Sequence, residues 1–235
     1  IAQSPNLPGL HDVDLAGDLT ASVGIPVLAE NDALAAAYGE YRLSAMQAGA
    51  LVYIGLGTGV GGGLIYGGKP VAGEHGVAME IGHIIVEPGG RLCGCGNQGC
   101  LEQYASASGV SLSYKALSGR DADAHAVADA ALAGDAFAIE AYRMAGVRLA
   151  QALAHIAKVV DVGQVIVGGG MSLSWPLMQE AFHQRLQIDL IPVLRGKIHI
   201  QVSSSGDIAG IVGAALLSAQ SHLDQPDVIH PSSST

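Results

Sequence analysis

The sequence predicts an α/β fold with open sheets, in which ligands bind at the carboxyl ends of strands. Short apolar segments typical of buried strands alternate with longer segments whose apolar residues recur at helical spacing. Glycine-rich turns follow two of the strand-like segments, at residues 57–63 and 168–170. With 235 residues, the chain is long enough for one large domain or two smaller ones.

The first residues are expected to form a helix, a strand and a second helix. Helical spacing covers residues 14–23, and a glycine and a proline end that helix. The apolar run over 26–31 is typical of a strand. Asp32 can cap the alanine-rich helix that follows over 33–44.

The next segment combines strands with a long irregular region. Residues 50–71 contain two β-type runs that flank a glycine-rich link, which predicts a hairpin or paired strands. Residues 73–103 alternate glycine with polar and metal-binding residue types, and their pattern favours no helix longer than about two turns.

Helices dominate the remainder. Apolar residues at helical spacing predict four of them, over residues 123–134, 135–161, 171–186 and 207–220. A buried strand that breaks into a glycine turn is expected over 164–170, and another strand over 197–203. The polar residues 221–235 are expected to be disordered.

Composition limits the partners of the chain. With 21 acidic and 11 basic residues, the formal charge is −10, which repels phosphate backbones and acidic lipid headgroups. We therefore expect neither nucleic acid nor membrane as a partner of this segment. No apolar run reaches the roughly 18 residues that span a bilayer. Three cysteines in an acidic chain indicate no secreted disulfide framework, so the cytoplasm is the expected compartment.

A zinc site is predicted from four residues. Cys93, Cys95 and Cys100 lie within eight residues of one another, and His83 lies ten positions upstream of the first. Three thiolates and an imidazole complete the tetrahedral shell of a structural Zn²⁺ site. The cysteines would alternatively be small buried apolar residues. A disulfide would leave the third thiol unpaired.

The glycine turns are candidate phosphate and nucleotide sites. Residues 57–63 match GxGxxG, but a strand follows where the dinucleotide motif requires a helix, and no Lys-Ser or Lys-Thr completes a P-loop. The turn can still offer backbone N–H groups and the Thr58 hydroxyl to phosphate. A glycine hairpin without a ligand is the alternative. The second turn lets the backbone approach a flat group closely. The candidate residues are Gly57, Thr58, Gly59, Gly61, Gly168, Gly169 and Gly170.

Three carboxylates are candidates for chemistry on a hydroxylated substrate. Asp32 stands where a strand is expected to end and a helix to begin, so it can accept a proton from a substrate hydroxyl during phosphoryl transfer. The alternative is that Asp32 only caps the helix. Glu80 and Glu102 flank the zinc residues with His83 and suit the hydroxyls of a sugar. As isolated residues, both would be solvated charges.

Taken together, these features resemble the ROK family (repressor, open reading frame, kinase) of sugar kinases and sugar-responsive repressors. The resemblance spans about residues 4–219, and the zinc residues are its most specific part. It rests on five blocks: SPNLPG (4–9), ENDALAAAYGE (30–40), GLGTGVGGG (55–63), EIGH (80–83) continuing through CGCGNQGCLE (93–102), and VIVGGG (165–170).

The resemblance implies an actin- and hexokinase-like (ribonuclease H-like) fold with two lobes, and sugar and ATP meeting in the cleft between them. Residues 1–32 would be a remnant of the N-terminal lobe, to which 207–220 returns as a helix. Residues 33–206 would form the C-terminal lobe, with the zinc-binding loop at 83–102.

The resemblance also implies roles for individual residues. Asp32 would be the base that takes the proton from the primary hydroxyl of a hexose, with glucose the first choice. His83 would bind zinc through one ring nitrogen and face the sugar through the other. The first glycine turn would hold the phosphates of ATP, which brings Mg²⁺, and the second would hold adenosine. The remaining hydroxyls would be held by Asn31, Glu80, His83 and Glu102, with help from Asn6.

Two features depart from the family pattern. Met79 stands where the family has glycine before EIGH, so we expect a rearranged backbone there. The family's first phosphate loop, an Asp with paired Gly, has no counterpart in the sequence. We therefore expect the chain to be an N-terminally incomplete part of a sugar kinase and inactive by itself.

Two other functions remain open at this stage. The same zinc block occurs in sugar-sensing domains of ROK repressors, whose DNA-binding segment would precede Ile1. A non-catalytic sugar-binding module held together by zinc is the other alternative. The alanine-rich helices and residues 135–161 offer apolar faces for a homodimer, which we expect, although a face buried within one lobe would have the same pattern.

Overall fold

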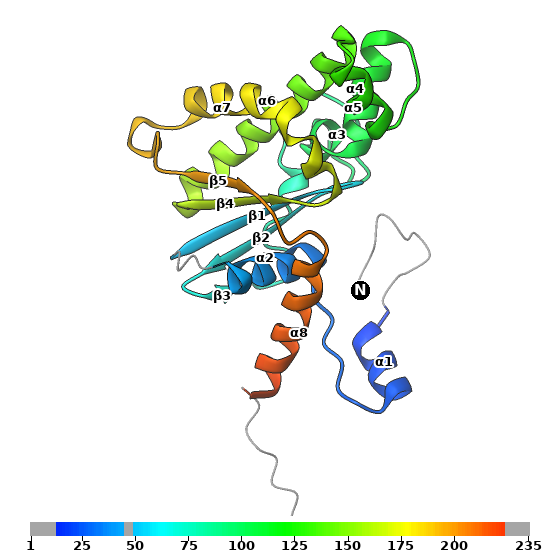
Figure 1. Ribbon diagram of the computed structural model, residues 1–235. Helices are drawn as coiled ribbons and strands as arrows, with labels where there is room; N and C mark the ends of the chain where they lie inside the picture. Colours follow the sequence, from blue (N-terminus) through cyan, green and yellow to red (C-terminus); the bar gives the residue numbers. More distant parts are fainter. Residues whose placement is uncertain (1–12, 45–48, 224–235) are drawn as a thin grey trace, which may run out of the picture.

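The computed structural model describes residues 13–44 and 49–223, with only the backbone placed for 221–223. A mixed five-stranded sheet in the order β3-β2-β1-β4-β5 forms its centre (Figure 1). The strands are β1 (Ala50–Leu56), β2 (Val60–Tyr66), β3 (Lys69–Pro70), β4 (Gln164–Gly168) and β5 (His199–Val202). The α-helices are α1 (Leu15–Val23), α2 (Asp32–Leu43), α3 (Glu102–Ala105), α4 (Ala107–Ser118), α5 (Ala124–Leu132), α6 (Ala136–Val160), α7 (Trp175–Asp189) and α8 (Ile208–Leu223). Three short 3₁₀ helices are η1 (Ile81–His83), η2 (Gly170–Ser174) and η3 (Pro192–Leu194).

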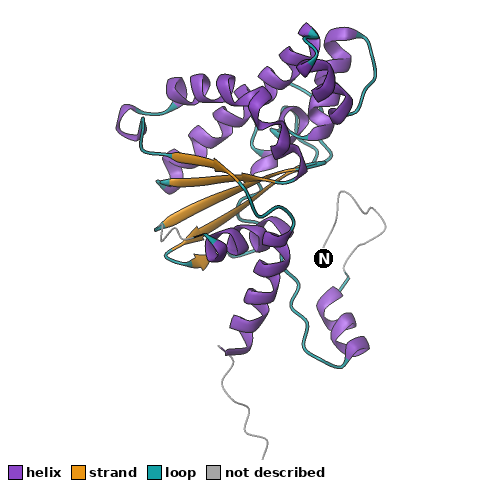
Figure 2. Cartoon of the chain, in the orientation of Figure 1, coloured by secondary structure: helices purple, strands orange, loops and turns teal. Residues whose placement is uncertain are grey.

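Helices cover both faces of the sheet, as Figure 2 shows. Alternate residues of β1 point to opposite faces. Leu51 and Tyr53 pack with α2 and α8, whereas Val52 and Ile54 belong to the larger core that contains α6 and α7. The predicted α/β class is therefore confirmed.

Strand directions bring the two glycine turns to one edge of the sheet. β1 pairs antiparallel with β2, which confirms the expected hairpin, and it pairs parallel with β4. Gly55 is the register partner of Gly168, so the ends of β1 and β4 lie side by side. Parallel strands that end at one edge create the position where α/β proteins bind ligands.

Helix α8 crosses α2 where both helices carry glycine. A Cβ on Gly213 would lie 2.7 Å from the carbonyl carbon of Ala35 and 2.8 Å from the nitrogen of Gly39. A Cβ on Gly39 would likewise overlap the carbonyl oxygen of Ala209. The close approach of the two backbones therefore requires glycine at both positions, and it sets where the helices begin at the edge of the sheet.

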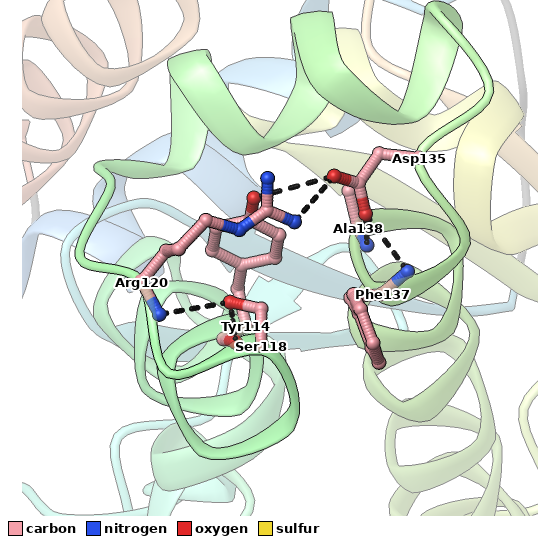
Figure 3. A network of polar contacts seen from close by, with 6 residues as sticks. All are labelled: Tyr114, Ser118, Arg120, Asp135, Phe137 and Ala138. Atoms are coloured by element: carbon pink, nitrogen blue, oxygen red, sulfur yellow. Dashed lines mark hydrogen bonds and ion pairs between the residues drawn. The ribbon is translucent and has the colours of Figure 1, made fainter.

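A polar network joins the helical layer beyond the sheet (Figure 3). Arg120 donates to Asp135 over 2.5 Å, and its guanidinium lies over the Tyr114 ring. Asp135 also caps α6 by accepting from the N–H groups of Phe137 and Ala138. The hydrogen bond from Arg120 lowers the pKa of the Asp135 carboxyl. One carboxylate thus fixes both the start of α6 and the end of α4.

Three predicted elements differ from the structure. Residues 26–31 are exposed and extended, but no strand among the described residues pairs with them, so the strand prediction was wrong. Helix α4 was not predicted, although Ser106 caps its start and Gly119 adopts φ 72° at its end. Helix α8 continues to Leu223, so residues 221–223 are helical where a disordered tail was expected. The remaining residues of that tail lie outside the described residues, as does Asn6.

Within residues 13–44 and 49–223, no helix combines the length and apolarity that crossing a bilayer would require.

The proposed division into a remnant of one lobe and a second lobe stays a prediction. Helix α1 stands apart from the sheet in Figure 1 and has no buried residue.

Gly213→Ala is expected to destabilise the protein by about 2 kcal/mol, because the added methyl group overlaps the α2 backbone. Gly210→Ala on the same helix is the matched control. Its Cβ meets nothing within 4 Å, so we expect a gain of up to about 1 kcal/mol from helix propensity. Urea unfolding of both variants measures the difference. Equal stabilities would contradict the close helix crossing.

Candidate functional site

A cavity of about 550 Å³ opens at the carboxyl ends of β1 and β4. Its polar side chains come from separate segments that include the start of α2, the residues around η1 and the start of α3, and glycines of both turns line it as well. The polar residues among its lining are Asn31, Asp32, Tyr53, Thr58, Glu80, His83, Glu102 and Asp207. The predicted site residues within the described part of the chain that line it also include Gly57, Gly59, Gly61 and Gly169.

Asp32 lies at the first position of α2 and is exposed to the cavity. The N-cap is Asn31, whose Oδ1 accepts from the N–H groups of Ala33 and Leu34. The interpretation of Asp32 as the helix cap was therefore wrong. Asp32 Oδ1 does accept from Ala33 N–H over 2.8 Å. The second carboxylate oxygen and the Asn31 amide group remain available to a ligand.

His83 and Glu80 belong to one tight turn that lines the cavity. The 3₁₀ helix η1 begins after Glu80 and ends at His83. The His83 ring presents Nε2 to the Glu80 carboxylate at 3.8 Å, and both residues line the cavity. The other ring nitrogen, Nδ1, faces Cys93. One ring nitrogen therefore faces the cysteine cluster and the other faces a carboxylate that lines the cavity, while the roles expected of them stay predictions.

Glu102 begins α3 and reaches back across the cavity wall. Its Oε2 accepts from Val60 N–H over 3.1 Å, and a Cβ on Gly59 would overlap this carboxylate oxygen. A side chain at position 59 would displace the Glu102 carboxylate, so glycine here favours the observed position of Glu102 whether or not the turn binds a phosphate. Glu102 links the helix after the cysteine loop to the turn between β1 and β2.

The four predicted metal ligands converge. The donor atoms of His83, Cys93, Cys95 and Cys100 all lie within 4.8 Å of one another. His83 Nδ1 is 3.7 Å from Cys93 Sγ, and the sulfurs of Cys95 and Cys100 are 3.6 Å apart. Tetrahedral zinc with its usual bond lengths places such donors about 3.5–3.8 Å apart. The donor set and its geometry therefore fit Zn²⁺.

The thiols need a cation to ionise together. Burial and the two neighbouring thiols raise the pKa of Cys100 to about 12. The pKa of Cys95 is instead lowered, chiefly by a hydrogen bond from the Asn97 backbone. Zinc binding would deprotonate all three thiols. The cysteines are free, so the disulfide alternative is not supported.

Arg91 fastens the cysteine loop to α3 and α4. Its guanidinium lies 4.6 Å from the centre of the Tyr104 ring and donates to the Gln103 and Gly109 carbonyls and to Ser113 Oγ. The N–H of Arg91 also donates to the Tyr104 hydroxyl over 3.0 Å. These contacts hold the loop beside the helix that carries Glu102.

Several glycines of the two turns are explained by close packing or by a left-handed backbone, without a ligand. A Cβ on Gly61 would lie 2.9 Å from Ala33 Cβ, and a Cβ on Gly168 would overlap the Tyr53 ring. Gly169 adopts φ 81° next to the Leu56 carbonyl. Only Gly57 and Gly170 face open space, and Gly168 and Gly170 are not among the residues that line the cavity. Helix and strand packing thus accounts for much of the pattern that suggested a nucleotide.

Comparisons with known proteins identify the family. A model of the ROK family matches residues 1–221. The chain belongs to the ROK family. It is 36% identical over 227 residues to a glucokinase of Thermotoga maritima, with 90% of this chain and 72% of that protein covered. It is 33% identical over 213 residues to an N-acetylmannosamine kinase of Citrobacter koseri, with 90% and 71% covered.

Solved ROK structures share the fold. A glucokinase from Streptomyces griseus in complex with glucose and AMPPNP superposes with a TM-score of 0.81 at 35% identity, covering 94% of this chain and 76% of that one. A ROK hexokinase from Thermus thermophilus gives a TM-score of 0.82 at 32% identity, covering 94% and 74%. A ROK transcriptional regulator gives 0.81 at 26% identity, covering 93% and 58%. The actin- and hexokinase-like fold expected from the resemblance is confirmed.

Two polar residues of the ROK cavity were missed by sequence reasoning. Asp207 precedes α8 and follows β5, so it repeats the strand-end signal that singled out Asp32 and could have been found that way. Tyr53 sits inside β1, where a continuous apolar run indicates burial and nothing more. No pattern in the sequence marks its hydroxyl as part of a cavity.

Met79, the departure from the ROK pattern, adopts φ 65°. A left-handed backbone favours glycine, so Met79→Gly is expected to be more stable than Met79→Ala by about 1 kcal/mol. The two variants differ by one methyl group and lose the same side-chain packing. Thermal unfolding measures the difference. A more stable alanine variant would contradict the left-handed conformation.

Removal of zinc is expected to unfold residues 83–102. Zinc at a thousandfold excess over its dissociation constant stabilises the folded chain by about 4 kcal/mol, and a strong chelator removes this contribution. Cys100→Ser should abolish the effect of the chelator, whereas Ser118→Ala, far from the donor set, should retain it. Calorimetric melting with and without chelator tests this. An unchanged melting curve would contradict a structural metal.

Proposed function

We propose that the protein is an ATP-dependent sugar kinase that phosphorylates the primary hydroxyl of a hexose, glucose being the first candidate. One observation carries the proposal: the Asp32 carboxylate faces the same cavity as Glu80, His83 and Glu102. Sugar kinases among the ROK relatives support it. Zinc would be structural, and Mg²⁺ would accompany the nucleotide. The expected homodimer and cytoplasmic location stay predictions.

In this proposal Asp32 is the general base. Its carboxylate accepts the proton of the primary hydroxyl as that oxygen attacks the γ-phosphorus of ATP. Bound Mg²⁺ supplies charge neutralisation for the phosphates. The Asn31 amide, the Glu80 and Glu102 carboxylates and His83 Nε2 hold the other hydroxyls, which orients the sugar toward Asp32. The turn at 57–59 would face the phosphates.

The regulator alternative has one supporting observation, the fold shared with a ROK transcriptional regulator. A sugar-sensing domain and a non-catalytic sugar-binding module would both bind sugar without requiring nucleotide. Calorimetric titration of the complete gene product with glucose and with Mg-AMPPNP separates the classes. Binding of both ligands supports the kinase, and binding of sugar alone favours the other two.

Asp32→Asn is expected to reduce the rate of ADP release by at least about 100-fold, because the amide cannot take the proton. Glucose affinity should change far less, since the amide retains the shape and one acceptor of the carboxylate. The assay uses Mg-ATP, a panel of hexoses and the complete gene product. Glu74→Gln, an exposed acid outside the lining of the cavity, is the control and should be as active as the wild type. Wild-type activity in Asp32→Asn would refute Asp32 as the base.

A further inference from the structure

Tyr53 is a buried tyrosine whose hydroxyl has no protein partner. The residue is 6% exposed, its ring lies over Gly168, and it lines the cavity from β1. Among residues 13–44 and 49–223, no hydrogen bond is formed by its hydroxyl. The other buried tyrosines have partners for theirs: Tyr38 with Gln220, Tyr104 with Arg91, Tyr114 with Asp135, and Tyr142 with Ala124.

The hydroxyl is reachable from the cavity, because no side-chain oxygen or nitrogen buried from solvent lacks a hydrogen-bond partner among the described residues. A tyrosine hydroxyl that lines a cavity without a protein partner is available to a ligand there as donor or acceptor. Gly55 and Gly168 flank the ring and are register partners on adjacent strands. Because neither has a side chain, the ring can extend between the strands to the floor of the cavity.

The environment keeps Tyr53 protonated. Burial, together with the charges of Glu40, Asp32 and Asp207, raises the pKa of Tyr53 to about 12. Glu40 is itself bonded to Ser203 and Ser205, so its carboxylate is already engaged. At neutral pH the Tyr53 hydroxyl is therefore a donor without a protein partner, open to water or to an acceptor oxygen of a ligand in the cavity.

The position of Tyr53 within the sheet favours phosphate over sugar as that acceptor. The polar wall formed by η1 and Glu102 contacts β2 and the turn that precedes it. Tyr53 lies on β1 and faces the opposite neighbour, β4, beside Gly169 and Asp207. Asp32 lies close enough for its charge to act on the Tyr53 hydroxyl, and the Tyr53 ring lies against Gly168 of the second glycine turn. A phosphoryl group bound between that second turn and Asp32 would therefore lie beside Tyr53.

We propose that the Tyr53 hydroxyl donates a hydrogen bond to a phosphate oxygen of the bound magnesium nucleotide, which makes Tyr53 a binding residue of the phosphate side of the cavity. This inference rests on the proposed kinase function and adds a contact to it. The cation that accompanies the nucleotide offsets the repulsion between its phosphates and the carboxylates of Asp32 and Asp207.

Tyr53→Phe tests the contact because it removes only the hydroxyl and keeps the ring over Gly168. Calorimetric titration of the complete gene product with Mg-AMPPNP is expected to show affinity reduced by about 10-fold or more, as for a hydrogen bond to a charged group. Affinities for adenosine, which lacks phosphate, and for glucose should be unchanged.

Tyr38→Phe is the matched control. It removes a buried tyrosine hydroxyl from the same hydrophobic cluster, but one that already bonds to Gln220 and Arg42. We expect this variant to melt at a lower temperature and to bind Mg-AMPPNP as the wild type does.

Four results would overturn the proposal. Tyr53→Phe could bind Mg-AMPPNP as tightly as the wild type. It could lose glucose affinity alone, which would place the hydroxyl on the sugar. It could lose all three ligands together with a lower melting temperature, which would make its role structural. Finally, absence of Mg-AMPPNP binding by the complete wild-type gene product would refute the kinase function as well, whereas the first three results leave that function intact.

Discussion

The imidazole of His83 is the link on which the arrangement of the site depends. One ring nitrogen faces three thiols and the other faces the cavity beside Glu80. A metal bound to the first nitrogen would fix the tautomer and the direction of the second. The same loop leads directly into α3, so the position of Glu102 follows from the same anchor. A short stretch without regular secondary structure can in this way hold polar side chains rigidly against a sheet.

A second constraint is the close approach of α2 to β2. Gly63 lies against Ala37 and the Ala33 carbonyl, and a Cβ on Gly61 would meet Ala33. Small residues on both elements bring the start of α2, and with it Asp32, to the edge of the sheet. The glycines that resemble a nucleotide motif are therefore also the means by which the acidic residue is placed. Packing of α2 against β2 and binding of a phosphate by the turn would thus both favour glycine, at neighbouring positions of the chain.

The sequence predicted those parts of the fold that burial alone determines. Short apolar runs and helical apolar patterns identified the sheet and most helices, because they record which residues avoid water. The strand prediction for residues 26–31 was wrong, because a strand needs a hydrogen-bonded partner strand and apolar composition does not show whether one is present. Helix α4 was missed because its serine-rich sequence has little apolar contrast, although both of its caps are visible.

The site was predictable where residue chemistry is distinctive. Three thiols and an imidazole together are typical of a zinc site, so the sequence could predict that these four side chains converge. The choice between Asn31 and Asp32 as the helix cap depended on side-chain orientation, which spacing does not reveal. The Tyr53 hydroxyl depended on what surrounds a buried ring, which is a property of the tertiary structure.

The central claim is that a single metal ion joins His83 to the three cysteines. X-ray absorption at the zinc edge of the purified, zinc-loaded chain tests it most directly. The account predicts three sulfur neighbours at about 2.3 Å and one nitrogen at about 2.0 Å. Fewer than three sulfurs, or a shell without an imidazole nitrogen, would contradict it.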